Sequence, residues 1–560
     1  MHTLGTAPDV GGYDPAPNQA PPLVDYNPFT SDEALVEAVE RHGGRGPLDG
    51  LAVLGRLAGS AQTRHWADQA NTVTPVLRTH DRYGTRIDEV EFHPAWHRLM
   101  QVAVTHGLAG AAWTGGPAAH VTRAAGFMVW GGAESGHGCP VSMSYAAVAA
   151  LRADPEAASP WEPGLTSLVY DFGLRPAAGK AGLICGMAMT EKQGGSDVRA
   201  NTTAAAPLDA EGEYLLRGHK WFCSAPMSDL FLVLAQAPGG LTCFIVPRVL
   251  PDGTRNPFRL QRLKDKLGNR SNASAEVEFD GTWARRLGPE GRGVPTIIEM
   301  VSMTRLDCVL GSAGIMRRAV AEAAHHAAHR SAFGALLSDK PLMQNVLADL
   351  AVESEAATAL GIRLAAAFDT TDGAADNTAE RAFRRIAVAA GKYWVTKRAI
   401  AVAAEALECL GGNGYVEESG MPRLLREAPV NSVWEGSGNV NALDVLRAAA
   451  REPDSVEALF AEAALAVGAD RRFDAALAET RDALTGLTDP QAAEFGARRI
   501  VERMAVLLQG SLLLRYAPHA IADAFCASRL AGGGGATFGT LPSGLDVKSI
   551  VVRTTPQLEG

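Results

Sequence analysis

Two different spacings of hydrophobic residues divide the chain into helical and β-rich parts. Apolar residues recur at helical spacing from about 95 to 175, from about 293 to 450 and again from about 455 to 530. Between about 181 and 287 the apolar runs are short, and glycine or proline separates them. A helix face repeats about every 3.6 residues, whereas closely spaced short strands with turn residues are typical of a barrel or sandwich. The pattern therefore predicts helices, then a compact β unit, then an antiparallel helical bundle with a helical appendage.

Local signals refine these boundaries. Thr30-Ser31-Asp32-Glu33 resembles a capping box that opens a helix. Ile87 to Phe92 alternates like a short strand. We expect the following helical stretch to break at Gly131-Gly132 and at Cys139-Pro140.

The first thirty residues contain six prolines among polar neighbours, which excludes a helix. Such a segment is either disordered or an arm lying on a neighbouring subunit. Together these patterns predict an α+β multidomain protein. Its predicted units are an extended arm (1–30), an N-terminal helical domain (31–180), a middle β domain (181–290), a helical bundle (291–447) and an additional C-terminal helical domain (448–560).

Composition narrows the class of protein. The 560 residues carry a net charge of -10, so a generic nucleic-acid coat is excluded and any DNA contact needs a local basic patch. The 7 cysteines are dispersed without a CxxC pair, which indicates reduced thiols and a cytoplasmic location. The chain begins without a basic region followed by an apolar run, so we expect no secretory signal. No run reaches about 18 uninterrupted apolar residues, so we expect no membrane-spanning helix.

One string at the entrance to the β region combines a glycine pair with hydroxyls: Met187-Ala188-Met189-Thr190-Glu191-Lys192-Gln193-Gly194-Gly195-Ser196-Asp197-Val198. Glycines let the backbone approach a bulky planar ligand, and Thr190 and Ser196 supply hydrogen-bonding groups. By itself the string is equally consistent with a Gly-Ser turn between strands.

A second pair of strings follows in the bundle. Leu410 to Tyr415 ends a long helix at a glycine turn, and Val433-Trp434-Glu435-Gly436-Ser437-Gly438-Asn439 comes about twenty residues later. A carboxylate held against apolar surface has a raised pKa, which suits a general base. Glu435 is therefore a candidate base, and a helix-capping glutamate is the alternative.

Taken together, these motifs resemble the acyl-CoA dehydrogenase family of flavoproteins. The shared features, in the family's order, are Thr190 to Val198, His219 to Phe222, Arg330-x-x-Phe333-Gly334, Leu410 to Tyr415 and Trp434 to Ser437. Met189 to Gly195, Arg262 to Ser274, Phe92 to His97, the N-terminal arm and the extra C-terminal block resemble the AidB-like branch, whose members are adaptive-response flavoproteins linked to DNA alkylation.

The resemblance implies an FAD site and roles for individual residues. Met189, Thr190, Gly195 and Ser196 would line the isoalloxazine and ribityl chain, and Phe222 and Ser224 would close over the ring. Glu435 would be the catalytic base, with Arg305 near it and Trp434 beside it, and Ser437 and Asn439 would hold the adenine side. Arg330 and Phe333 would reach the FAD of a neighbouring subunit, where Arg330 would pair with the pyrophosphate, and Gln344 and Gly412 would complete that shared site. The resemblance therefore implies a homodimer or, more typically, a homotetramer.

Three functions compete at this stage. The first is FAD-dependent α,β-desaturation of a short or branched acyl-CoA, although Glu191-Lys192-Gln193 departs from the family's usual Glu-Pro sequence. The second is an AidB-like protein that protects DNA against alkylation, with Arg471-Arg472 and Arg498-Arg499 as the basic clusters. From Val445 to Gly560 the chain carries 12 Lys+Arg against 14 Asp+Glu. The third is a di-metal oxidase built on Glu134-x-x-His137 and Glu322-x-x-His325, and it is disfavoured because single partner glutamates are missing. We predict no metal site, and the electron acceptor stays open.

Overall fold

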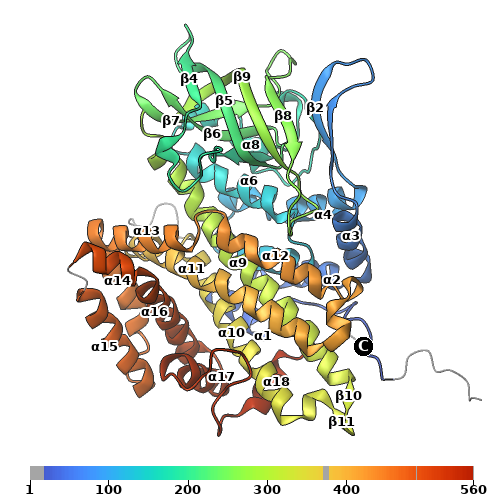
Figure 1. Ribbon diagram of the computed structural model, residues 1–560, viewed down its shortest axis with the longest axis vertical. Coiled ribbons are helices and arrows are strands. Elements are labelled where there is room, and N and C mark those ends of the chain that lie inside the picture. The colour runs from blue at the N-terminus through green and yellow to red at the C-terminus, as the bar shows by residue number, and fades with distance from the viewer. Residues whose placement is uncertain (1–17, 370–377, 487–488, 559–560) are drawn as a thin grey trace, which may run out of the picture.

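The computed structural model describes residues 18–369, 378–486 and 489–558. Figure 1 shows a β-rich unit seated on one end of a larger helical body. One long helix, α9 (Gly293–His329), runs from beneath the β unit through the helical body.

The N-terminal part is helical and carries one hairpin. Its main elements are α1 (Glu33–Gly43), α2 (Leu48–Gly59), α3 (Ala61–Thr72), β1 (Val76–His80), β2 (Arg86–Glu91), α4 (Pro94–Thr105), α5 (Ala119–Ala133), α6 (Gly138–Leu151), α7 (Pro155–Ala158) and α8 (Glu162–Leu165). The predicted start of a helix here is confirmed, but the capping box is wrong: Glu33 is the first helical residue, and the cap is Asp32, whose carboxylate accepts from the Leu35 backbone N–H.

The expected break at Gly131-Gly132 is wrong, because α5 continues through both glycines. For Gly132 the reason is packing, since α5 and α9 cross closely there, whereas a β-carbon on Gly131 would meet no atom within 4 Å. A β-carbon on Gly132 would lie 3.3 Å from the Gly314 carbonyl oxygen, and one on Gly314 would lie 2.5 Å from the Met128 carbonyl oxygen. Glycine therefore lets two helix backbones approach one another.

The middle part is a closed barrel. Its strands are β3 (Cys185–Ala188), β4 (Ala204–Pro207), β5 (Glu213–Ser224), β6 (Leu230–Ala237), β7 (Gly240–Pro247), β8 (Phe258–Leu263) and β9 (Ser274–Leu287). The order β6-β4-β5-β9-β7 returns to β6, because β7 pairs with both β9 and β6. The prediction of a barrel or sandwich is thereby resolved in favour of the barrel.

Long helices form the rest of the chain. They are α10 (Pro341–Ala366), α11 (Thr378–Cys409), α12 (Met421–Val433), α13 (Gly438–Arg451), α14 (Pro453–Ala464), α15 (Arg471–Thr485), α16 (Pro490–Tyr516), α17 (His519–Phe525) and α18 (Val547–Thr554). A short hairpin, β10 (Ser331–Ala332) and β11 (Ala335–Leu336), joins α9 to α10.

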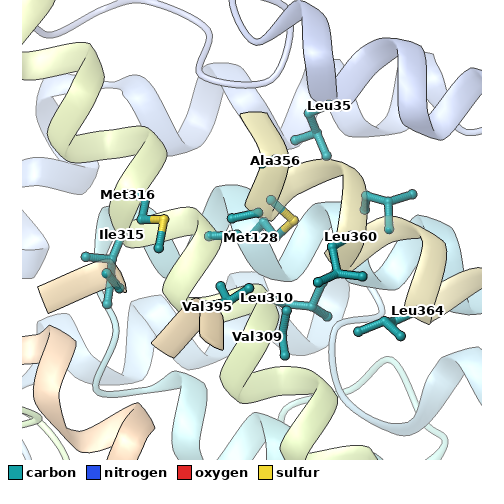
Figure 2. Packing of buried hydrophobic residues seen from close by; sticks show 14 of the residues in the cluster. Leu35, Met128, Val309, Leu310, Ile315, Met316, Ala356, Leu360, Leu364 and Val395 are labelled. Carbon is teal, nitrogen blue, oxygen red and sulfur yellow. The ribbon is translucent and has the colours of Figure 1, made fainter. Parts of the chain in front are cut away.

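One hydrophobic core joins the N-terminal helices, the bundle and the C-terminal block. Figure 2 shows Leu35 of α1, Met128 of α5, Leu310 of α9, Leu360 of α10 and Val395 of α11 packed together. The same cluster continues into α15 and α16. The C-terminal block therefore shares the core of the bundle, and the predicted domain boundaries remain predictions.

The N-terminal segment is ordered over residues 18–30, so the expectation of disorder is wrong there, while contact with a neighbouring subunit stays a prediction; residues 1–17 lie outside the described part. Residues 18–30 lie on their own chain, with Leu23, Tyr26 and Phe29 buried. Arg318 of α9 donates to the Tyr26 hydroxyl at 2.7 Å. Buried aromatic and aliphatic side chains hold this stretch in place, which proline content alone does not reveal.

Candidate active site

The turn between α12 and α13 presents Glu435. Its backbone is left-handed, with φ of 57°, and Gly436 follows with φ of 91°. The Thr304 hydroxyl of α9 donates to the Glu435 carboxylate at 2.6 Å. The Arg305 Nε donates to the Glu435 backbone carbonyl at 3.0 Å, and Lys392 Nζ of α11 donates to the Gly436 carbonyl at 2.7 Å. Three side chains from two helices thus fix an unusual backbone conformation.

Burial sets the charge state of this carboxylate. Desolvation raises the pKa of Glu435 above its ordinary value, while the Thr304 hydrogen bond and the charges of Lys392 and Arg305 oppose that rise. Arg305 is itself paired with Asp444 at 2.6 Å, so its charge is largely engaged. The net result is a base whose proton affinity is higher than that of an exposed glutamate.

The neighbouring wall is apolar. Trp434 and Met189 pack against one hydrophobic cluster, to which Cys139, Met143 and Met300 belong. Met189 comes from the loop after β3 and Trp434 from the α12–α13 turn, so the structure brings these two predicted residues to one cluster. Trp434 therefore packs beside the candidate base, and its predicted contact with the cofactor stays a prediction.

A buried ion pair organises the loop after β3. Lys220 Nζ of β5 lies 2.8 Å from Glu191 Oε1, and both side chains are fully buried. Glu191 also accepts from the backbone N–H groups of Thr202 and Thr203. These contacts lower the pKa of Glu191 far below its ordinary value. The pair anchors the segment that carries the predicted flavin residues.

Within this loop the backbone and side chains lie close together. The Thr190 carbonyl accepts from the Trp221 N–H at 2.9 Å, and a β-carbon on Gly195 would lie 2.4 Å from the Thr190 hydroxyl. Ser196 is exposed nearby in the same loop. A side chain at position 195 would therefore displace the Thr190 side chain from its present position.

The end of β5 supplies the two remaining predicted residues of the barrel. Phe222 leaves 51% of its surface exposed, and the Ser224 hydroxyl lies 2.9 Å from that of Ser274 on β9. An aromatic ring half open to solvent is available to cover a planar ligand.

The amino end of α13 carries Ser437 and Asn439. Asn439 Oδ1 accepts from Arg498 Nε of α16 at 2.8 Å. Lys397 of α11 lies over the same helix end, since its Nζ would be 2.9 Å from a β-carbon on Gly438. Two cations at a helix amino end, where the dipole is also positive, favour an anionic ligand.

The remaining predicted cofactor residues lie elsewhere. Arg330 follows α9 and is 25 residues beyond Arg305, a distance of about 37 Å along a helix that rises 1.5 Å per residue. Phe333 lies in the β10–β11 hairpin and is 97% exposed, and Gln344 Nε2 donates to the Ser338 carbonyl. Gly412 lies in the turn after α11, where Gly411 has a left-handed φ of 58° as predicted. One chain therefore does not bring this set to Glu435.

The other polar clusters from the sequence have local partners. Glu134 and His137 are buried and hydrogen-bonded at 2.8 Å, and Glu134 also accepts from the Asn71 amide and the Ser271 hydroxyl. Groups of three metal-ligating side chains do not occur in the described residues.

Of the basic pairs, Arg472 is bound to Asp470 and Asp523, which leaves less of its charge for phosphate. In the described part of the chain, no helix is long and apolar enough to cross a bilayer. All seven cysteines are buried free thiols.

Four residues that contribute to this geometry were not predicted: Thr304, Lys392, Asp444 and Arg498. Thr304 precedes Arg305 and could have been considered for that reason. The other three approach from distant segments, and their local sequences carry no signal.

Comparison with known proteins places this geometry in a family. Residues 18–172 match the adaptive response protein AidB N-terminal domain, 186–282 the acyl-CoA dehydrogenase middle domain and 291–450 the acyl-CoA dehydrogenase C-terminal domain. The putative acyl-CoA dehydrogenase AidB of Escherichia coli is 46% identical over 91% of this chain and 93% of its own length. The chain belongs to the acyl-CoA dehydrogenase family.

Other relatives agree with this assignment. Acyl-CoA dehydrogenase family member 11 of Caenorhabditis elegans is 31% identical over 69% of this chain and 64% of its own length. The crystal structure of Caenorhabditis elegans ACDH-11 in complex with C11-CoA has a TM-score of 0.84 at 26% identity and covers 94% of this chain and 95% of that chain. With its AidB N-terminal domain, the protein is an AidB-like member of the acyl-CoA dehydrogenase family.

FAD is the cofactor of acyl-CoA dehydrogenases, and this protein is an FAD-dependent oxidoreductase of that type. The residues present fit such a group. Gly195 brings the loop backbone close to the Thr190 hydroxyl, the Phe222 side chain is half exposed, and cations stand at the amino end of α13. The individual assignments of cofactor residues remain proposals.

Proposed function

We propose that the protein desaturates the α,β bond of a short or branched acyl-CoA thioester, with Glu435 as the base. The observation that carries this proposal is the carboxylate itself: it is fixed by Thr304, its pKa is raised by burial, and it adjoins an apolar wall. A raised pKa brings a carboxylate closer to the range in which it accepts a proton efficiently.

The reaction removes two hydrogens from the substrate. Glu435 takes the α-proton, and the electron pair of that C–H bond forms the new double bond as a hydride leaves the β-carbon. FAD, when bound, accepts this hydride. Thr304 holds the carboxylate oxygen in place, while Arg305 and Lys392 hold the backbone of the turn. The surrounding methionines and Trp434 keep water away from the base.

The proposal includes an oligomer with shared flavin sites. Arg330, Phe333, Gln344 and Gly412 lie too far from Glu435 to serve the same cofactor in one chain. Large apolar side chains are open on that end of the molecule, with Phe333 97%, Leu342 83% and Tyr415 82% exposed. A second copy would cover them, as exposed apolar groups favour association. We propose a homotetramer in which each flavin receives residues from two subunits.

An anaerobic titration tests the chemistry. The flavin-loaded protein is mixed with acyl-CoA esters from short and branched chains up to C11, and the oxidised-flavin absorbance is followed. One ester class should bleach the flavin rapidly, and Glu435→Gln should abolish bleaching while retaining the flavin. Glu408→Gln, on an exposed face of α11, is the matched control. A wild-type flavin that no ester reduces would overturn the proposal.

The second candidate is association with duplex DNA, which the AidB-like branch supports. Its weakness here is that Arg472, Arg515, Arg529 and Arg553 of the C-terminal block are all held in ion pairs. Retention on duplex DNA that falls steeply with salt, and that Arg471→Ala with Arg472→Ala weakens, would support this candidate. Unchanged retention in the double variant would remove these arginines from it.

A further inference from the structure

Asn18 of the N-terminal segment forms hydrogen bonds at the start of the β10–β11 hairpin. The Asn18 side chain accepts from the Ser331 backbone N–H at 2.7 Å and donates to the Ser331 carbonyl at 2.8 Å. The Asn18 carbonyl accepts from Arg330 Nη1 at 2.5 Å. Asn18 therefore binds two consecutive residues where α9 ends and the hairpin begins: its backbone carbonyl binds Arg330, and its side chain binds Ser331.

The same stretch also reaches the turn after α11. Gln19 Oε1 accepts from the Asn413 side-chain amide at 3.0 Å. Two residues further on, the Pro21 carbonyl lies 2.9 Å from His325 Nε2 of α9. Asn18 and Gln19 thus connect the β10–β11 hairpin to η5 (Gly411–Tyr415), two elements that are far apart in sequence.

Arg330 is held without being neutralised. Its described partner is the Asn18 carbonyl, and among the described residues no carboxylate forms an ion pair with it. A guanidinium has five N–H donors, so most of them remain available to another acceptor. Arginine in this state suits a phosphate, which it binds through two parallel hydrogen bonds.

We propose that Asn18 and Gln19 are positioning residues, which orient Arg330 and the Gly411–Asn413 turn toward the diphosphate of a flavin dinucleotide held by a neighbouring subunit. This inference rests on the shared flavin site of the proposed function. It assigns the N-terminal segment a task on its own chain: fixing the orientation of a cation that serves the neighbour. Fixing that orientation in advance lowers the entropy lost on binding.

The backbone conformation of Asn18 allows a test of its positioning role. Its φ is 55°, a left-handed conformation that asparagine and glycine adopt most readily. Asn18→Ala removes both side-chain hydrogen bonds and disfavours this backbone, so the carbonyl that binds Arg330 should move. Asn18→Gly removes the side chain but keeps the backbone conformation, and it carries the test if the alanine variant does not fold.

The readout is flavin affinity of the apoprotein, measured by fluorescence for FAD and for FMN. FMN lacks the adenylate half and the diphosphate linkage, so loss of a diphosphate contact narrows the FAD-to-FMN affinity ratio. Arg330→Ala and Asn18→Ala should each narrow the ratio by about tenfold, the effect of about 1.4 kcal/mol. Asn27→Ala is the control, because it breaks hydrogen bonds of the same segment to α2 without touching Arg330.

The outcomes separate the two levels of the proposal. If Arg330→Ala narrows the ratio but neither Asn18 variant does, the positioning role is wrong and the shared flavin site stands. If Arg330→Ala leaves the FAD-to-FMN affinity ratio unchanged, the proposed shared flavin site is wrong, and the positioning role of Asn18 and Gln19 is wrong with it. If Asn27→Ala narrows the ratio as much as Asn18→Ala, general loosening of the segment explains the effect and the specific role is overturned.

Discussion

Thr304→Val isolates the hydrogen bond that tunes Glu435. The wild-type carboxylate accepts from the Thr304 hydroxyl at 2.6 Å, and this bond opposes the rise in the pKa caused by burial. Valine has nearly the same shape as threonine and donates no hydrogen bond. A hydrogen bond to a charged group contributes about 1.5–3 kcal/mol, and each pKa unit corresponds to about 1.4 kcal/mol. The pKa of Glu435 should therefore rise by about one to two units in the variant.

The direction of the pH effect follows from the role of the base. Glu435 must be deprotonated to act, so the rate of flavin bleaching increases as the pH rises through the pKa of Glu435. In Thr304→Val this rising, acidic limb of the pH–rate profile should move to higher pH, and the plateau rate reached above it should change little. Rapid-mixing measurements of bleaching by the best acyl-CoA ester, across a pH series, give both quantities.

A matched variant controls for the substitution itself. Thr480→Val, on α15, also removes a buried hydroxyl, but that hydroxyl donates only to the Ala476 carbonyl. Its pH profile should coincide with that of the wild type. If Thr304→Val lowers the plateau without moving the limb, the hydroxyl does not tune the base, and our account of the pKa of Glu435 is refuted.

Four further predictions concern other parts of the molecule. Lys220→Met leaves Glu191 buried without its cation and should lower the stability by about 3–5 kcal/mol, measured by urea unfolding. In the wild type the pKa of Glu191 lies below its ordinary 4.5, so thermal melts should show its stabilisation present above that pH and lost on further acidification. Arg498→Ala should weaken FAD binding several-fold in a fluorescence titration, and the exposed neighbour Arg499→Ala should not. Gly59→Ala should lower the melting temperature by several degrees, because its β-carbon would lie 1.7 Å from a carbonyl of the N-terminal segment.

Features determined by neighbouring residues could be predicted from the sequence. Short stretches of sequence determine the turn after α11, the start of α1 and the strands of the barrel. They also place Glu435 directly beside Trp434. The resemblance to acyl-CoA dehydrogenases rests on the same kind of local motif, and the family assignment is confirmed.

Features that depend on distant contacts could not. The N-terminal segment lies on α9 because Leu23 and Tyr26 are buried together with Ala321 of that helix. Nothing in a proline-rich string indicates which surface receives these side chains. Arg498 meets Asn439 only because α16 packs against α13. Gly131 and Gly132 suggest a helix end by propensity, yet α5 continues through both, and at Gly132 it packs closely against α9.

The continuity of α9 makes its length as consequential as its composition. Thr304 and Arg305 sit near one end and Arg330 follows the other, with no break between. Inserting or deleting a single residue between them would turn everything beyond by about 100° and shift it by about 1.5 Å. Relatives that use both ends of α9 in this way should therefore vary in the residues between Arg305 and Arg330 but keep the number of those residues. The turn at Pro251 to Gly253, which only joins two strands, should tolerate insertions.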